Sequence, residues 1–292
     1  MHGAGNDFVI LDLFDQPGLA EGPLDRFAIA MCDRHRGAGG DGLLTLEPAR
    51  LGSGCAVRMR MWNPDGTGDM CGNGLRCVAA LAVARGRAAD APFQVETLAG
   101  PRPAWVEPGG QVTVGMGMPI FDAPRVPLSR LAAETIAGQA GAGRHGLSAG
   151  AFEYDLPVEG RLLSHVSSLS TGSTHTVIFG AVPVEESEFL RLSPQLEVHP
   201  WFPERSSIMW ATRRGPNRFS LRIWERGVGE TLACGTGACA VAVAAGLTGR
   251  SQGIVTLECR GGTLSAAWEP GTEIRLTGPT RRVFEGVFFS AL

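Results

Sequence analysis

A cysteine directly before a Gly-x-Gly segment occurs twice in the chain. The two copies are Cys71-Gly72-Asn73-Gly74 and Cys234-Gly235-Thr236-Gly237. Each copy opens a run rich in alanine, valine and leucine, Leu75–Ala84 in the first and Ala238–Ala245 in the second, which favours a helix. Each cysteine should therefore stand at a helix N-terminus, where free backbone N–H groups and the helix dipole favour a thiolate. The same N–H groups could bind a carboxylate or a phosphate.

The alternative for a single copy is a buried helix with an inert thiol, because free cysteine is often a small core residue. Two copies in matching contexts favour chemistry instead. Trp105 and Trp268 also begin similar segments that end in Glu-Pro-Gly, and they lie 163 residues apart, which is the separation of Cys71 and Cys234. The equal separations indicate an internal duplication.

The size and charge of the chain limit its classes of function. Its 292 residues fit two domains of about 150 residues each. A net charge of −3, with no basic block, argues against a nucleic-acid partner or an acidic membrane surface. No apolar run reaches the ~18 residues of a membrane span, and no signal peptide is recognised. The seven cysteines are odd in number and widely spaced, so we expect reduced thiols in a cytoplasmic protein.

The basic residues are all arginine or histidine, and no lysine occurs. Because pyridoxal phosphate is bound through a lysine Schiff base, the sequence excludes pyridoxal chemistry. A thiol redox role is disfavoured because no Cys-x-x-Cys motif is present. A metal site would need clustered ligands, and His175 lies far in the sequence from Cys71 and Cys234. We therefore expect neither a cofactor nor a metal.

Alternating apolar and polar residues predict several strands around each expected helix. Each half is thus strand-rich around one apolar helix, which predicts the α+β class. We expect two pseudo-symmetric domains, each a curved and mostly antiparallel sheet around its central helix. The first domain is placed at 1–118 with a return strand at about 278–292, and the second at 119–277. The apolar run 282–289 has no counterpart in the first half and is predicted to complete the first sheet.

Two acid/base groups that flank one carbon can invert it without a metal or cofactor, because one removes a proton and the other returns one to the opposite face. If the two halves pack about a pseudo-twofold axis, Cys71 and Cys234 face one cleft between the domains. The α-proton of an amino acid is poorly acidic. Two helix N-termini directed at the α-carboxylate would stabilise the charge that develops as this proton leaves.

Segments spread over nearly the whole chain resemble those of the diaminopimelate epimerase family, whose superfamily includes proline racemase. These segments are His2–Phe8, Asn63–Gly66, Cys71–Cys77, Phe202–Arg205 and Glu225–Gly237. The resemblance implies a homodimeric, cofactor-independent isomerase that converts LL- to meso-diaminopimelate in lysine and cell-wall precursor synthesis. It also implies two similar halves that enclose a small amino-acid substrate.

By this resemblance, Cys71 and Cys234 are the acid/base pair. The residues that hold the reacting carboxylate through backbone N–H groups are Gly72, Asn73, Gly235 and Thr236. The residues that bind other polar groups of the substrate are Asn6, Asn63, Glu225 and Arg226, and His175 assists one thiol. Taken singly, these residues also have plain structural interpretations, such as a turn, a strand cap, a core histidine or a surface ion pair.

The chain departs from the family pattern at two places. The family usually has Asn-Pro-His where this chain has Ser173-Thr174-His175, and an asparagine after Phe-Pro-Glu-Arg where this chain has Ser206-Ser207. Both places belong to the part that reads the substrate side chain. Ser173 and Ser207 can still donate a hydrogen bond but reach less far, and a water could fill the gap. A racemase of another amino acid is therefore the alternative. A non-catalytic amino-acid-binding protein is a third interpretation, against which both cysteines argue.

Overall fold

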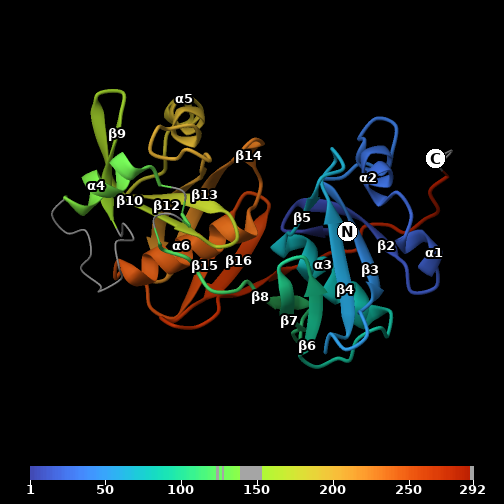
Figure 1. Ribbon diagram of the computed structural model, residues 1–292. Helices are drawn as coiled ribbons and strands as arrows, with labels where there is room; N and C mark the ends of the chain where they lie inside the picture. Colours follow the sequence, from blue (N-terminus) through green and yellow to red (C-terminus); the bar gives the residue numbers. More distant parts are fainter. Residues whose placement is uncertain (123–124, 127, 139–152, 290–292) are drawn as a thin grey trace. The chain divides into compact units, whose positions relative to one another are not determined.

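The computed structural model describes residues 1–289 except 123–124, 127 and 139–152 (Figure 1). The chain divides into two compact units. Unit 1 consists of Met1–Gly115 and Thr277–Leu292, and unit 2 of Met116–Leu276. The chain therefore passes from unit 1 into unit 2 and back again.

Unit 1 is built from strands around helix α3 (Gly72–Ala84). Its strands are β1 (His2–Gly3), β2 (Asn6–Asp12), β3 (Gly42–Pro48), β4 (Val57–Trp62), β5 (Gly68–Asp69), β6 (Phe93–Thr97), β7 (Gly100–Val106), β8 (Gln111–Gly115) and β17 (Arg275–Pro279). Helix α3 packs against β1, β3, β7 and β8 and is buried over most of its length. Two further helices, α1 (Pro17–Ala20) and α2 (Leu24–Cys32), belong to the same unit, and α2 packs on β3 through Ala28 and Met31.

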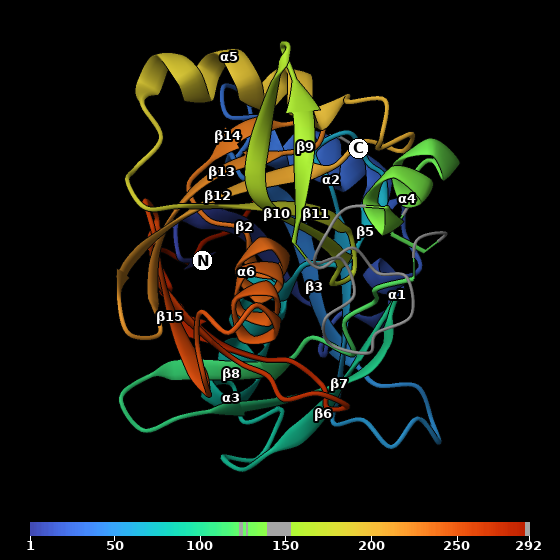
Figure 2. The same cartoon turned by 90° about the vertical axis from the view of Figure 1, so that its left-hand side faces the viewer.

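Unit 2 repeats this plan around helix α6 (Gly235–Leu247), which is orange in Figure 2. Its strands are β9 (Tyr154–Val158), β10 (Arg161–Ser170), β11 (Thr174–Gly180), β12 (Ser207–Gly215), β13 (Arg218–Glu225), β14 (Gly229–Thr231), β15 (Ile254–Cys259) and β16 (Gly262–Ala267). Helices α4 (Arg130–Ala137) and α5 (Glu186–Glu197) complete it. Because α6 is apolar on every face, it must be buried, and it packs against β11, β12 and β16.

The strand pairings show the duplication directly. In unit 1, β2 pairs parallel with β3, β3 antiparallel with β4, and β4 parallel with β6. In unit 2, β11 pairs parallel with β12, β12 antiparallel with β13, and β13 parallel with β15. Each central helix follows a short antiparallel partner strand, β5 or β14. The predicted α+β class with two similar halves is confirmed.

The end of the chain differs from the prediction. The strand that returns to unit 1 is β17 and not the run 282–289, which forms no strand. Around β17, Met116 N donates to Ile274 O at 2.8 Å, and the hydroxyls of Thr113 and Thr277 lie 2.6 Å apart. Beyond Pro279, Arg281 forms an isolated bridge with His2, and Phe288 packs against the apolar cluster between α2 and β3 without forming a strand.

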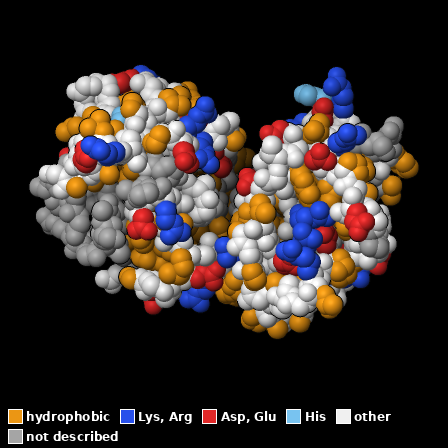
Figure 3. Space-filling model, viewed as in Figure 1, with side chains coloured by type: hydrophobic (Ala, Val, Ile, Leu, Met, Phe, Trp, Pro, Cys, Tyr) orange, Lys and Arg blue, Asp and Glu red, His pale blue; other side chains and the backbone are white. Residues whose placement is uncertain are grey.

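Side chains of both charges are interspersed with apolar ones on the face shown in Figure 3. No helix in the described part of the chain is long and apolar enough to cross a membrane.

Candidate active site

Cys71 occupies the N-cap position of α3, in extended backbone with φ −134° and ψ 124°. Its Sγ donates to Asn6 Oδ1 at 3.6 Å, and Asn73 Nδ2 donates to the same oxygen at 3.2 Å. Asn6 is brought to the helix by the β1–β2 hairpin, whose tight turn uses Ala4 and Gly5 at positive φ (53° and 87°). Asn6, Cys71 and Asn73 form the unit 1 half-site.

Asn63 begins the turn between β4 and β5. Its backbone N–H donates to Thr67 O at 2.8 Å, and its Nδ2 donates to Thr67 Oγ1 at 3.1 Å. Asn63 therefore stabilises this turn.

Cys234 occupies the matching N-cap position of α6, with φ −126° and ψ 116°. Its Sγ accepts from Gly237 N at 3.3 Å and lies 3.3 Å from Thr236 Oγ1 and 3.8 Å from His175 Nε2. Burial raises the pKa of the Cys234 thiol well above its usual range. The Glu225 carboxylate raises this pKa further, against the hydrogen bonds from Thr236 and Gly237.

His175 is fully buried on β11. Its Nδ1 lies 2.7 Å from the carbonyl oxygen of Ser173, which can only accept, so Nδ1 carries the hydrogen and Nε2 is the acceptor. Nε2 lies 3.1 Å from Thr236 Oγ1. Burial lowers the pKa of His175 to about 4, so the ring is neutral at neutral pH, and its Nε2 can accept a hydrogen bond from the Cys234 thiol or the Thr236 hydroxyl. Ser173 thus acts through its backbone carbonyl and orients the histidine.

Ser207 begins β12 and pairs in register with His175 on the parallel strand β11. Its Oγ accepts from the backbone N–H of Arg226 at 3.1 Å. The guanidinium of Arg226 donates from Nη1 to Glu204 O at 3.0 Å, which fixes its direction. Glu225, the last residue of β13, accepts from the Thr231 hydroxyl. The unit 2 half-site consists of His175, Ser207, Glu225, Arg226, Cys234 and Thr236.

Glu197 is a further residue of unit 2 that the sequence did not single out. It ends α5, is 7% exposed, and its carboxylate accepts from Trp224 Nε1 at 2.7 Å and from Gly227 N at 2.9 Å. Arg205 Nη1 lies 3.4 Å from the same carboxylate. Glu197 therefore holds the turn that carries Arg226. No motif of the sequence analysis contains Glu197.

The two helix starts also supply backbone donors. The first helical bonds are Leu75 N to Cys71 O at 2.8 Å and Ala238 N to Cys234 O at 2.9 Å. The N–H groups of Gly72, Asn73 and Gly235 come before these bonds and point out of the helix ends. Such donors suit a carboxylate. Within the described residues, no three His, Cys, Asp or Glu side chains are grouped to hold a metal ion.

The model of the family described as diaminopimelate epimerase matches residues 1–121 and 167–283. The diaminopimelate epimerase of Desulforudis audaxviator is 39% identical over 100% of this chain and 98% of its own length. The diaminopimelate epimerase of Desulfitobacterium hafniense is 39% identical over 98% of this chain and 96% of its own length.

Two solved structures share the fold. A phenazine biosynthesis protein of the PhzF family from Bacillus anthracis has a TM-score of 0.62 at 20% identity, over 96% of this chain and 92% of that chain. A hydroxyproline epimerase from Agrobacterium vitis, with trans-4-hydroxy-L-proline bound, has a TM-score of 0.57 at 14% identity, over 91% of this chain and 79% of that chain. Because the family model matches both halves and the curated relatives align from end to end, the chain belongs to the diaminopimelate epimerase family.

Proposed function

We propose that the protein is an isomerase that converts LL- to meso-diaminopimelate with Cys71 and Cys234 as its acid/base pair. The observation that carries the proposal is the pair of helix starts, each with a cysteine at its N-cap position. The chain is 39% identical, over at least 98% of its length, to enzymes named diaminopimelate epimerase, which supports diaminopimelate as the substrate.

The proposed reaction is a proton exchange at one carbon. One cysteine, as thiolate, takes the α-proton, and the electron pair of the broken C–H bond moves onto the α-carboxylate. The other cysteine, as thiol, then delivers its proton to the opposite face, so no atom or charge is gained or lost. His175 Nε2 lies 3.8 Å from Cys234 Sγ and is proposed to orient this thiol as a hydrogen-bond acceptor.

The reacting carboxylate is proposed to be bound by both half-sites. There the N–H groups of Gly72, Asn73, Gly235 and Thr236 would bind its oxygens. These donors matter most as charge builds on the carboxylate in the transition state, which raises kcat and not only affinity.

The far end of the substrate is proposed to meet Arg226, whose guanidinium suits a second carboxylate. Ser207 Oγ accepts from the Arg226 backbone, so the hydroxyl hydrogen is left to donate toward the substrate. Glu225 is the acidic partner for the distal amine. We assign Asn6 to the polar groups of the substrate at the reacting end, and Asn63 to the turn beside it.

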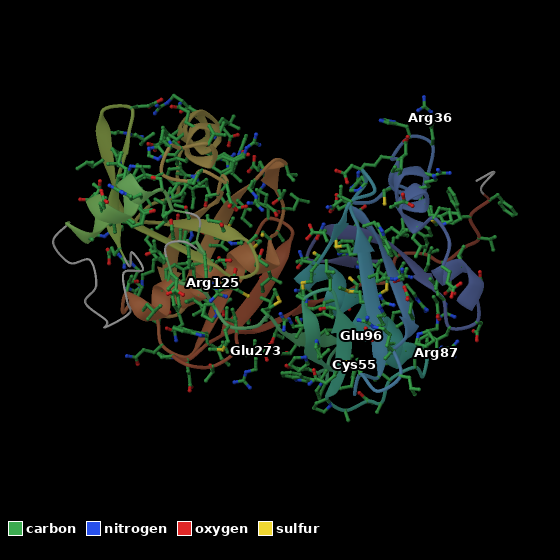
Figure 4. The ribbon with its side chains drawn as sticks, in the orientation of Figure 1. Arg36, Cys55, Arg87, Glu96, Arg125 and Glu273 are labelled. Carbon is green, nitrogen blue, oxygen red and sulfur yellow. The ribbon has the colours of Figure 1, made fainter. Side chains whose placement is uncertain are left out.

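The test is α-proton exchange in D₂O with LL-diaminopimelate, ornithine, histidine and glutamate, for the wild type, Cys71→Ala and Cys234→Ala. We expect inversion of diaminopimelate by the wild type and loss of inversion in both variants, because a single thiol cannot serve both faces. Cys55→Ala is the matched control, since Cys55 lies on a loop of unit 1 and donates to Ser53 O (Figure 4). Near-normal turnover by either active-site variant would contradict the two-thiol mechanism. Faster exchange with another amino acid would support a racemase instead.

We further propose a cytoplasmic homodimer. A reducing compartment keeps both thiols available. The exposed apolar residues near the C-terminus, Val283, Phe284, Val287 and Phe289, support a self-association surface in unit 1. Light scattering on the wild type and on the double variant Phe284→Glu, Val287→Glu tests this, with a dimer expected for the first and a monomer for the second. A monomeric wild type would refute it.

A further inference from the structure

The two amides of the unit 1 half-site lie between two charged groups. Asn6 Nδ2 donates to Asp41 Oδ2 at 2.7 Å, and Asn73 Nδ2 donates to Asn6 Oδ1 at 3.2 Å. Arg76 Nη2 donates to Asn73 Oδ1 at 2.7 Å. A carboxylate can only accept and a guanidinium can only donate. The charged ends therefore fix which face of each amide carries oxygen and which carries nitrogen.

The orientation of the Asn6 amide determines which of its atoms faces the Cys71 thiol. The Asn6 oxygen, and not its NH₂ group, faces Cys71 Sγ at 3.6 Å. An oxygen acceptor suits an S–H donor and offers nothing to a thiolate. Cys234, in the same position of the duplicated helix, instead accepts a backbone N–H from Gly237. The two cysteines thus have matching backbone but different side-chain neighbours, Asn6 for Cys71 and His175 with Thr236 for Cys234.

Both ends of this amide chain are held in place. Asp41 Oδ1 accepts from Arg34 Nη2 at 2.7 Å, and Asp41 Oδ2 also accepts from Asp7 N at 3.0 Å. Arg34 makes two further bonds to Asp7, at 2.7 and 3.0 Å. Burial alone would raise the pKa of Asp7, but the hydrogen bonds from Arg34 and the Asp41 contact outweigh it and lower that pKa. Asp7 and Asp41 thus hold Arg34 between them as carboxylates.

At the other end, Arg76 is fully buried in α3 beneath the β1 strand. A Cβ on Gly3 would stand 3.1 Å from Asn73 O and 3.3 Å from Arg76 Nη2. Only glycine lets β1 lie this close to the arginine, and Gly3 pairs with Asn6 across the hairpin. The hairpin that delivers Asn6 therefore also covers Arg76.

We propose that Asp41 and Arg76 are positioning residues that fix the direction of the Asn6–Asn73 amide pair and so present an acceptor oxygen to the Cys71 thiol. This rests on the proposed function, in which Cys71 exchanges a proton with the substrate.

The test is Asp41→Asn, which replaces the acceptor-only carboxylate and frees the Asn6 amide to turn its NH₂ toward Cys71. The readout is alkylation by iodoacetamide across pH 5–10, followed on tryptic peptide 61–76, which contains Cys71 as its only cysteine. We expect the midpoint of the pH profile for Cys71 to fall by about one unit, as for a thiol that gains a donor and loses a nearby negative charge. At neutral pH this is roughly a tenfold faster reaction.

Several charged groups set this profile, and only one is altered. They are Arg34, Asp7 and Asp41 beside β2, Arg76 within α3, and Asp69 on β5. Asp33→Asn is the matched control. It removes the same charge from the neighbouring loop, where Asp33 accepts the backbone N–H groups of His35 and Arg36. It should leave the Cys71 midpoint unchanged, and the Cys234 profile should be unchanged in both variants.

A merely loosened helix end would speed alkylation at every pH without moving the midpoint, and that result would overturn the proposal. An unchanged or raised midpoint would do the same. The readout needs no substrate, so it stands apart from the D₂O test. If the wild type did not turn over diaminopimelate but Asp41→Asn still shifted the Cys71 midpoint, the proposed function would be wrong and the positioning roles would stand.

Discussion

At the scale of single residues, the two duplicated cysteines lie in different surroundings. Cys71 is partly exposed and meets an amide oxygen, whereas Cys234 is 6% exposed and lies beside a neutral histidine. The backbone around each is nearly the same. The difference comes from the side chains that neighbouring strands bring to each thiol.

The buried histidine makes stability depend on pH. The His175 pKa falls from about 6.5 in the unfolded chain to about 4 in the fold, so the unfolded state binds more protons between these values. Its contribution to stability is complete above pH 6.5 and is lost as the pH falls toward 4. Between pH 7 and pH 5 we expect a loss of about 2 kcal/mol in the free energy of unfolding.

Urea unfolding at the two pH values measures this loss. His175→Asn should show a smaller pH dependence by that amount, whatever its stability at pH 7. The exposed His35→Asn is the control and should keep the wild-type difference. Equal pH dependence in His175→Asn and the wild type would show that the histidine is not buried in its neutral form.

Arg226 is the residue on which substrate choice should depend. Its guanidinium is aimed by Glu204 O, and lysine cannot reproduce its two-pronged contact with a carboxylate. Arg226→Lys should lose roughly 2–4 kcal/mol of transition-state binding for diaminopimelate, seen in kcat/KM. The wild type should prefer diaminopimelate over ornithine by about 10⁴-fold or more. Comparable rates with ornithine would show that the site does not recognise a second carboxylate on its substrate.

At the scale of elements, Gly237 near the start of α6 allows close packing against β12. A Cβ on Gly237 would overlap Met209 Sδ and stand 3.3 Å from Cys234 Sγ. Gly237→Ala should therefore displace Cys234, lower the melting temperature through overpacking of about 1–3 kcal/mol, and reduce turnover.

Gly246, later in the same helix, is the matched control. The nearest atom to a Cβ there is Trp268 Cε3 at 3.9 Å, so alanine fits and gains up to about 1 kcal/mol of helix propensity. Gly246→Ala should keep full turnover with an equal or higher melting temperature. Normal turnover in Gly237→Ala would mean that Met209 moves aside without disturbing the thiol.

At the scale of the whole molecule, each half-site is assembled within its own unit, and the units are built differently along the chain. Unit 2 is one continuous segment, whereas unit 1 needs β17 from the end of the chain. Glu273 Oε1 accepts from Gly117 N at 2.9 Å, so the chain enters and leaves unit 2 at neighbouring positions (Figure 4).

This arrangement predicts how fragments fold. Residues 116–276 should fold alone and melt cooperatively. Residues 1–115 alone should not, because β8 loses its partner β17 and His2 loses Arg281. Joining 1–117 to 273–292 through an Asn-Gly turn should restore folding. Circular dichroism melts of the three polypeptides measure this, and a stable fold of 1–115 alone would contradict the role given to β17.

The sequence by itself determined the two buried helices, the N-cap positions of both cysteines, and the duplication. These features follow from helix propensity, glycine punctuation and spacing, which act within a few residues of each other. The predicted runs Leu75–Ala84 and Ala238–Ala245 are confirmed, although both helices begin earlier, within the Gly-x-Gly segments at Gly72 and Gly235.

Only the tertiary structure decided what surrounds each thiol. Asn6 lies 65 residues before Cys71, and His175 lies 59 residues before Cys234. The packing of β1 on α3 and of β11 on α6 sets these neighbours, and contacts between elements so far apart in the chain leave no local signal. The amide directions of Asn6 and Asn73 depend on Asp41 and Arg76, which meet these amides only in the fold, because a carboxylate accepts and a guanidinium donates.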